Sequence, residues 1–246
     1  MRDNRIVCTN RTCTACTDIP WEPTMNPTEL INRYPQLHHM AEGGSWGSIQ
    51  QIGLRTTWQL VDECDPDPST RHEILRQRRK RSYTLTHPVV GAVTIRDQGP
   101  LGLHNLRPAL TDMTVEQWLE VLNNRVFLWA HPDRLTKLLK ARLYRDSIHE
   151  VLVVDTARLV DAHRDRIRLT GMNSGATIFP SAPKRGSATF QKIESFPFDD
   201  RRRARKALVD NVVEVCVLDG LHDVTDFVIR VERRKGATVV ETLFEA

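Results

Sequence analysis

The sequence lacks any long apolar run. Among its 246 residues, no stretch approaches the roughly 20 apolar residues that a helix needs to cross a bilayer. The first sixteen residues, MRDNRIVCTNRTCTAC, do not contain the apolar segment of a secretory signal. We therefore expect a cytoplasmic protein that has no association with a membrane.

Cysteine is also scarce. The chain has five Cys, an odd number that suits reduced thiols better than a disulfide framework. Cys8, Cys13 and Cys16 could bind zinc, but a closed structural zinc site needs four ligands, usually in CxxC-type pairs. We therefore predict that the protein has no metal site.

Several common catalytic and nucleotide-binding motifs are missing. The chain has no glycine-rich GxGxxG or GxxxxGK[ST] loop, so the Rossmann and P-loop folds lack their fingerprint. It has neither HExxH nor GxSxG, which argues against a zincin and an α/β-hydrolase.

The composition is that of an ordinary globular protein. Hydrophobic residues make up 40% and charged residues 27%, and 35 Lys and Arg minus 31 Asp and Glu give a net charge of +4. A charge this small does not by itself indicate nucleic-acid binding. Residues 1–24 lack an apolar period, whereas Met25 opens a segment that resembles a natural start followed by a capped helix. We predict a poorly packed extension over residues 1–24 and a single domain over residues 25–246.

The hydrophobic period switches repeatedly between those of helices and strands. Ser45 can cap a helix that ends at Gly53, and Thr114 with Gln117 forms a capping box. Helices fall mostly in the first two thirds and strands mostly in the last third, which favours an α+β fold. The segments expected to be extended include LHHMA, RVFLWA, EVLVVD, ATFQKI, VVEVCVL, TDFVIRVE and ATVVETLF.

The first candidate for a functional motif covers residues 37–57. His39 ends a short strand, and a glycine-containing loop and one helix follow before Gly53 and Leu54. An imidazole offers one hydrogen-bond donor and one acceptor, which suits it to hold a ligand hydroxyl. The alternative is a partly buried structural His, because buried polar groups usually find partners within the protein.

The second candidate, NNRVFLWAHPDRL, covers residues 123–135. Asn124 and Arg125 stand at the entrance of a strand, and Phe127 and Trp129 point to the same face as Arg125. Polar groups at a strand entrance could meet a ligand. The alternative is that both aromatic residues belong to the core.

The third candidate is VVEVCVL, residues 212–218. Alternation places Val213, Val215 and Val217 on one face and Glu214 on the other. A Glu in such a strand is seldom buried unless it is paired or functional, so Glu214 lies either on a solvated face or in a site. Glu194 is the second candidate for a functional carboxylate.

These segments, in the order His, aromatic strand and Glu, resemble the three motifs of the ADP-ribosyltransferase superfamily in its DarT-like and PARP-like branches. His39 takes the place of the family His and Ile49, Gly53 and Leu54 match the end of the first helix, whereas Ala41 stands where the family usually has Thr. The resemblance covers roughly residues 26–232. It implies a split antiparallel β-sheet with flanking helices, and NAD as a co-substrate. Several of the same segments are also similar to those of an uncharacterised bacterial family.

The resemblance also implies roles for individual residues. Glu214 would stabilise the ribosyl cation, and His39, or His38 if the register differs by one, would position the adenosine ribose. Phe127 or Trp129 would stack on nicotinamide, beside Arg125 at the strand entrance. The acceptor would be a nucleic acid, a protein or water, and an antitoxin is a conceivable partner of such an enzyme.

Two further polar regions are open to more than one interpretation. Arg96 resembles the Arg with which DarT-like enzymes stabilise phosphates or polarise the acceptor, and a salt bridge to a neighbouring strand is the alternative. Asn173-Ser174-Gly175 and Arg185-Gly186 belong to a loop that could cover a nucleotide or present the acceptor, although a plain surface loop is the default.

Two other functions compete with this hypothesis. The basic runs at residues 76–81 and 201–206 could contact phosphates, which would make the protein a nucleic-acid-binding module without catalysis. An RNA 2′-phosphotransferase, on a related fold, would also use NAD. Its pocket would need several Arg and a second His.

Overall fold

The computed structural model describes residues 25–204 and 206–246. The predicted extension over residues 1–24, with its three cysteines, lies outside the described residues. The main sheet consists of β1 (Gln36–Glu42), β4 (Arg125–Trp129), β5 (Ile148–Asp155), β6 (Ile167–Thr170), β7 (Glu214–Leu218), β8 (Val228–Lys235) and β9 (Thr238–Glu245). The helices are α1 (Pro27–Arg33), α2 (Trp46–Ile52), α3 (Thr57–Cys64), α4 (Pro68–Arg76), α5 (Leu103–Ala109), α6 (Val115–Asn123), α7 (Pro132–Leu139), α8 (Thr156–His163), α9 (Phe198–Arg203) and α10 (Leu208–Asn211).

The main sheet is antiparallel throughout, in the order β6-β7-β4-β1-β5-β8-β9. Together with the helices it confirms the predicted α+β class. β1 pairs with β5 at seven positions, from Gln36 opposite Asp155 to Glu42 opposite His149. On its other side β1 pairs with β4 only at His38 and Trp129. The two strands therefore separate beyond that pair.

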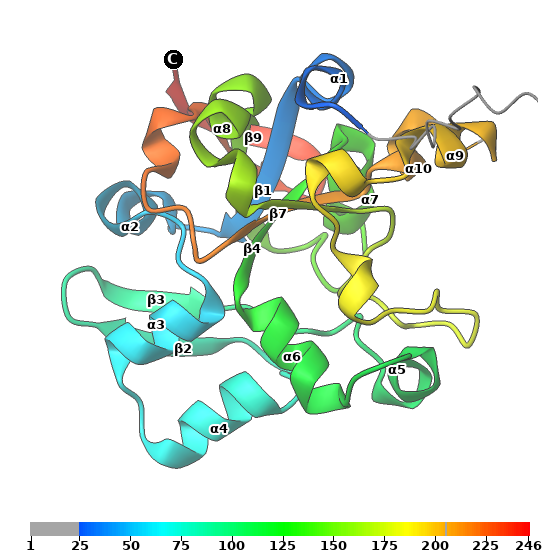
Figure 1. Cartoon of the computed structure of the whole chain (residues 1–246). Helices are drawn as coiled ribbons and strands as arrows, with labels where there is room; N and C mark the ends of the chain where they lie inside the picture. The colour runs from blue at the N-terminus through cyan, green and yellow to red at the C-terminus, as the bar shows by residue number, and fades with distance from the viewer. Residues whose placement is uncertain (1–24, 205) are drawn as a thin grey trace, which may run out of the picture.

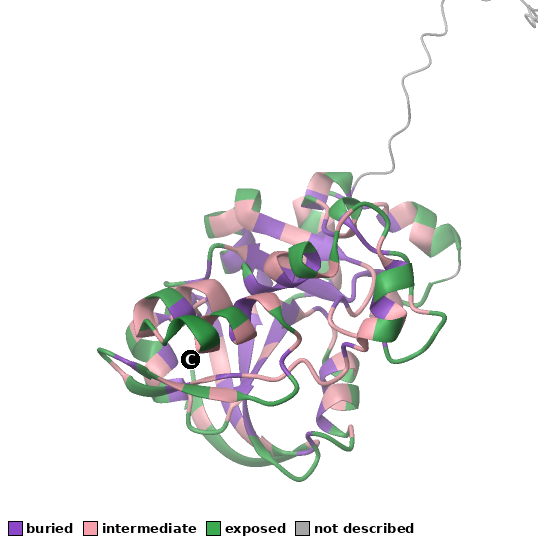
Figure 2. Ribbon diagram, turned by 90° about the horizontal axis from the view of Figure 1, so that it is seen from below, coloured by how far each residue is buried: buried purple, intermediate pink, exposed green. Residues whose placement is uncertain are grey.

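The two faces of the sheet pack against different helices. Val215 and Val217 of β7 join the largest core cluster, which includes Leu30 of α1 and Leu159 of α8. Cys216, on the opposite face, packs in a second cluster with residues of α5 and α6. Figure 1 shows α1 and α8 together on one side of the strands and α6 on the other, and Figure 2 shows the buried residues concentrated along the central strands.

A smaller unit packs beside the main sheet. The hairpin of β2 (Tyr83–His87) and β3 (Gly91–Ile95) forms a separate sheet, with α3 and α4 next to it in Figure 1. A small cluster that includes Val61, Leu75 and Ile95 holds these elements together. Arg79 attaches the unit to α6, because its buried guanidinium donates to the Asn123 Oδ1 (2.8 Å) and to the carbonyls of Ile74 and Arg96 (both 2.9 Å).

Most of the local expectations are confirmed. Asn26 caps α1, the Thr114–Gln117 capping box opens α6, and Gly53 ends α2 with a positive φ of 75°. The predicted cap of α2 is wrong, since Ser45 makes no side-chain capping bond. The Glu150 carboxylate of β5 instead accepts from the Trp46 amide at 2.7 Å. The Glu150 carboxylate, from a strand distant in sequence, thus caps the helix in place of Ser45.

One predicted strand is also wrong. ATFQKI is not an extended strand, because a 3₁₀ helix (Ser187–Thr189) ends in it and another begins at Ile193. Only Gln191 forms a bridge, to Leu169 of β6. None of the helices in the described residues is long and apolar enough to cross a bilayer.

Arg79→Met should lower the free energy of unfolding by about 3 kcal/mol, because the Asn123 oxygen and two carbonyls lose their charged donor inside the protein. Urea unfolding of the variant and of the wild type measures the difference. The control is Arg81→Met, since Arg81 is exposed. An equal effect of the two substitutions would contradict a structural role for Arg79.

Candidate functional site

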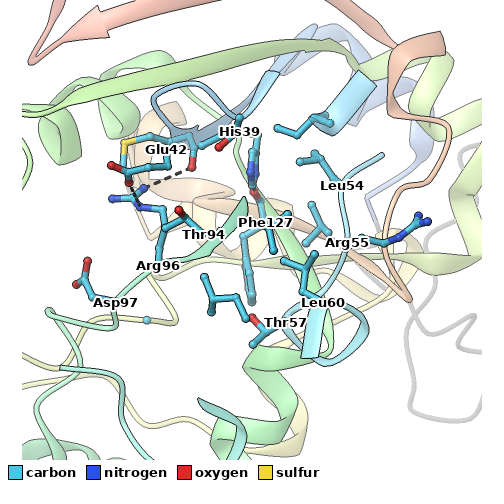
Figure 3. A pocket seen from close by; sticks show the side chains of 18 of the residues that line it. His39, Glu42, Leu54, Arg55, Thr57, Leu60, Thr94, Arg96, Asp97 and Phe127 are labelled. Carbon is cyan, nitrogen blue, oxygen red and sulfur yellow. Dashed lines mark hydrogen bonds and ion pairs between the residues drawn. The ribbon is translucent and has the colours of Figure 1, made fainter. Parts of the chain in front are cut away.

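A cavity of about 370 Å³ opens where β1 and β4 separate. Its walls come mainly from β1, α2, the end of β3, β4, Asn173 and Gly175. Five of the six site residues in our sequence prediction line it, namely His39, Arg96, Arg125, Phe127 and Trp129. In Figure 3, His39 lies directly above Phe127, with Arg96 and Glu42 on one side and Leu54 and Leu60 on the other.

His39 lies between the two separating strands. Its Nδ1 is 2.9 Å from the carbonyl oxygen of Phe127 in β4. Burial is the main cause that lowers the pKa of His39, and the nearby Arg96 lowers it further. A neutral ring that donates from Nδ1 to this carbonyl keeps Nε2 as an acceptor. The side chain can therefore accept a hydrogen bond from a ligand hydroxyl.

The structure distinguishes His39 from His38. The His38 side chain is buried, is not part of the cavity wall, and has its pKa lowered to about 4, mainly by burial and then by Arg234. Of the two neighbours, His39 is the one that reaches the cavity.

The three candidates on β4 line the cavity together. Phe127 is half-buried and tilted against Phe190, with ring centroids 6.0 Å apart. The Arg125 guanidinium lies 4.7 Å from the centroid of the same Phe190 ring, and its Nε has no hydrogen-bond partner in the described residues. Trp129 packs on the cluster around Tyr144. The aromatic side chains are thus both partial core residues and cavity wall.

Arg96 follows β3 and crosses to β1. Its Nε is 3.8 Å from the Glu42 carboxylate, Nη1 donates to the Met40 carbonyl at 3.4 Å, and the guanidinium lies 4.8 Å from the centre of the Tyr144 ring. The Tyr144 hydroxyl in turn donates to Asp97 at 3.2 Å. The salt bridge expected as the alternative is therefore present, and the guanidinium also lines the cavity.

Glu214 is the one predicted site residue outside the cavity wall. It stands at the start of β7, opposite Trp129, and its carboxylate accepts from the Ser174 amide at 3.2 Å. Only 5% of the residue is exposed, so the solvated-face alternative is wrong. Burial raises the pKa of Glu214 to about 7, against the opposing effects of the Ser174 hydrogen bond and of Arg185 and Arg134.

The neighbours of Glu214 include residues that sequence reasoning treated as a surface loop. Ser174 and Arg185 are both 2% exposed, and the Arg185 Nη1 donates to the Ser174 carbonyl at 2.8 Å. Asn173 and Gly175, on either side of Ser174, line the cavity. The Asn-Ser-Gly turn is therefore a wall between Glu214 and the cavity. Arg134, Tyr144 and Glu42 had no signal in the sequence that separated them from ordinary polar residues.

Glu194, the second candidate for a functional carboxylate, does not take part in this arrangement. It is in the 3₁₀ helix Ile193–Ser195, does not line the cavity, and forms a partly exposed ion pair with Arg164 at 2.7 Å.

Several described arginines of the two basic runs bind partners within the protein. In the first run, Arg78 donates to the carbonyls of Gln98 and Gly99, and Arg79 is buried. In the second, Arg202 pairs with Asp199 and Arg203 with Asp200. The ion pairs reduce the charge that the second run offers to a nucleic acid, and burial keeps Arg79 of the first run away from one. Within residues 25–204 and 206–246, no group of three or more His, Cys, Asp or Glu is placed to hold a metal ion.

A model described as a family of unknown function, DUF7002, matches residues 35–228. The chain belongs to the DUF7002 family. The DUF7002 match extends from the residue before β1 to the first residue of β8, so it contains Glu214 and every residue that lines the cavity. No curated protein matches the chain.

The raised pKa of Glu214 predicts how stability depends on pH. The folded state holds this proton up to about pH 7 and the unfolded state only to about 4.5, so the unfolded chain binds fewer protons between these values. Stability should therefore fall as the pH rises through this window, by roughly 3 kcal/mol from this group alone.

Glu214→Gln keeps the acceptor for the Ser174 amide and cannot ionise. Urea unfolding at pH 4.5, 6 and 8 measures the unfolding free energies of the wild type and of Glu214→Gln. The variant should become more stable relative to the wild type as the pH rises. A difference that does not change with pH would contradict the raised pKa.

Proposed function

We propose that this chain is an NAD-consuming enzyme, an ADP-ribosyltransferase or an NAD glycohydrolase. The observation that carries the proposal is the convergence of three distant segments. His39 and Phe127 line one cavity, and Glu214 lies on the strand next to Phe127. The resemblance in sequence predicts that a strand with His, a strand with aromatic residues and a strand with Glu lie together. These strands are β1, β4 and β7, and they are neighbours in the sheet in that order.

The pairing of the strands supports the finer description of the fold. An ADP-ribosyltransferase-like core has a split antiparallel sheet, and β1 and β4 share a single pair next to the cavity. His39 bridges the opening by its bond to the Phe127 carbonyl. The opening gives a ligand access to both strands at once.

The cavity wall contains groups that suit the adenosine ribose, the pyrophosphate and the nicotinamide of NAD. Nε2 of His39 would accept from a hydroxyl of the adenosine ribose, and Phe127 or Trp129 would stack on the nicotinamide ring. Arg96, which pairs with Glu42, and Arg125, whose Nε has no hydrogen-bond partner in the described residues, both line the cavity. Such guanidinium groups suit the pyrophosphate.

The chemistry needs a carboxylate near a developing cation. When the bond between nicotinamide and C1′ of the ribose breaks, nicotinamide leaves as a neutral molecule with the electron pair, and positive charge develops on the sugar. The Glu214 carboxylate would stabilise that charge in a dry environment. The acceptor or water then forms the new bond to C1′, and Glu214 can take the proton that the acceptor loses.

Glu214 is suited to this role only after a change in its surroundings. The Ser174 amide occupies the carboxylate, and residues 173–175 separate it from the cavity. The positive nicotinamide ring would favour the ionised form of a carboxyl whose pKa is about 7. We propose that NAD binding shifts the turn and brings the carboxylate to the ribose.

The cavity favours this function over an RNA 2′-phosphotransferase. His39 is the single histidine among the described residues that line the cavity, whereas the rival enzyme needs a second one. Several arginines line it, which either function can use.

Glu214→Gln should reduce the release of nicotinamide from NAD by about 100-fold or more, the scale of one lost transition-state contact. Binding of NAD, measured by isothermal titration calorimetry, should be retained. Glu194→Gln is the matched control and should release nicotinamide at the wild-type rate, because Glu194 lies in a surface ion pair. A folded Glu214→Gln protein with unchanged turnover would contradict the assignment.

Phe127→Ala should weaken NAD binding about tenfold, because the ring loses both contact area and stacking. The control is Phe179→Ala, since Phe179 is 69% exposed and outside the cavity. Calorimetry gives the affinity, and thermal unfolding shows whether the variant folds. A stable Phe127→Ala protein with wild-type affinity for NAD would show that Phe127 is only a core residue.

A further inference from the structure

A second cavity, of about 290 Å³, lies on the other side of the 171–175 segment. Gly171 and Met172 line this second cavity, whereas Asn173 and Gly175 line the first. Three of the described residues that line it have cationic side chains, and none has a carboxylate. The cations are Lys184, Arg185 and Arg201.

Three polar atoms of its lining are buried without a partner in the described residues. They are Nη2 of Arg185, Oγ1 of Thr170 and Oε1 of Gln191. Arg185 is 2% exposed, and its other donors, Nε and Nη1, bind the carbonyls of Pro183 and Ser174. Native proteins pair nearly all buried polar groups, so these three atoms have a hydrogen-bonding capacity that a ligand can satisfy.

The backbone is fitted closely around these cations. A Cβ atom at Gly171 would lie 2.2 Å from the Arg201 Cζ, so only glycine allows this approach. Arg201 in turn donates from Nη2 to the Gly171 carbonyl at 2.9 Å and from Nε to the Asn211 carbonyl at 2.8 Å. The guanidinium is thus held in place before any ligand binds.

We propose that this second cavity binds a phosphate group. The cationic side chains would neutralise its charge, and the free N–H of Arg185 would donate a charge-assisted hydrogen bond. Two of the atoms without partners, Thr170 Oγ1 and Gln191 Oε1, can accept a hydrogen bond, which suits a ligand that carries a hydroxyl hydrogen. Monohydrogen phosphate and a sugar phosphate both combine an anion with such a donor. Lys184 and Thr111 are exposed at the rim, so the cavity is open to solvent.

The position of this site connects it with Glu214. Arg185 holds the carbonyl of Ser174, and the amide of the same residue donates to Glu214. An anion on Arg185 therefore binds next to the turn that separates Glu214 from the first cavity. The phosphate site itself does not depend on the proposed function, because its binding is measured without NAD.

The test measures the melting temperature of the full chain at increasing concentrations of inorganic phosphate. Sodium chloride keeps the ionic strength constant. A ligand that binds the folded state raises this temperature. Ribose 5-phosphate and a short single-stranded oligonucleotide are the further arms. A response to ribose 5-phosphate alone indicates a sugar phosphate, and a response to the oligonucleotide alone indicates a nucleic-acid backbone. A response to phosphate indicates the free anion.

Two variants test whether binding occurs in this cavity. Thr170→Val removes a hydroxyl that has no partner, so without phosphate the protein should melt at the same temperature or higher, while phosphate affinity should fall about tenfold. Lys184→Ala should weaken binding severalfold, and Lys192→Ala, an exposed Lys outside the cavity, should not.

Three results would overturn the proposal. The first is a melting temperature that no phosphate compound raises above the sodium chloride control. The second is phosphate binding that Thr170→Val and Lys184→Ala leave unchanged. The third is a loss of affinity in Lys192→Ala equal to that in Lys184→Ala.

Discussion

The separation of β1 from β4 is the constraint on which the candidate site depends. Backbone pairing between neighbouring strands normally continues along their length, but here it stops at His38 and Trp129. The carbonyl of Phe127 is then bonded by the side chain of His39. One imidazole therefore pairs with the Phe127 carbonyl, keeps its Nε2 available, and lines the cavity.

A buried polar chain runs from Glu214 to Arg185, which lines the second cavity. Glu214, the Ser174 peptide and Arg185 form a line in which each member binds the next. A carboxyl that is buried in this way costs free energy unless its charge is compensated, and here burial outweighs the nearby cations. The group is consequently poised to change its ionisation near neutral pH. Such a property is common at functional sites, although structural networks also produce it.

Local sequence signals predicted the elements well because they act within a few residues. The capping box of Thr114 and the glycine after α2 need only their neighbours to form. The failures occur where distant groups compete with local ones. Glu150 replaces Ser45 at the start of α2, and Gln191 bridges to β6 within a segment that is otherwise not a strand.

The sequence by itself determined the α+β class, the alternation that puts Glu214 opposite a valine face, and the common face of Arg125, Phe127 and Trp129. These follow from the period of a strand, which each segment carries alone. Only the tertiary structure decided that His39 rather than His38 reaches the cavity, and that Ser174 and Arg185 enclose Glu214. These contacts join residues 11 to 88 positions apart, and their geometry depends on strand order and register, which no local pattern specifies.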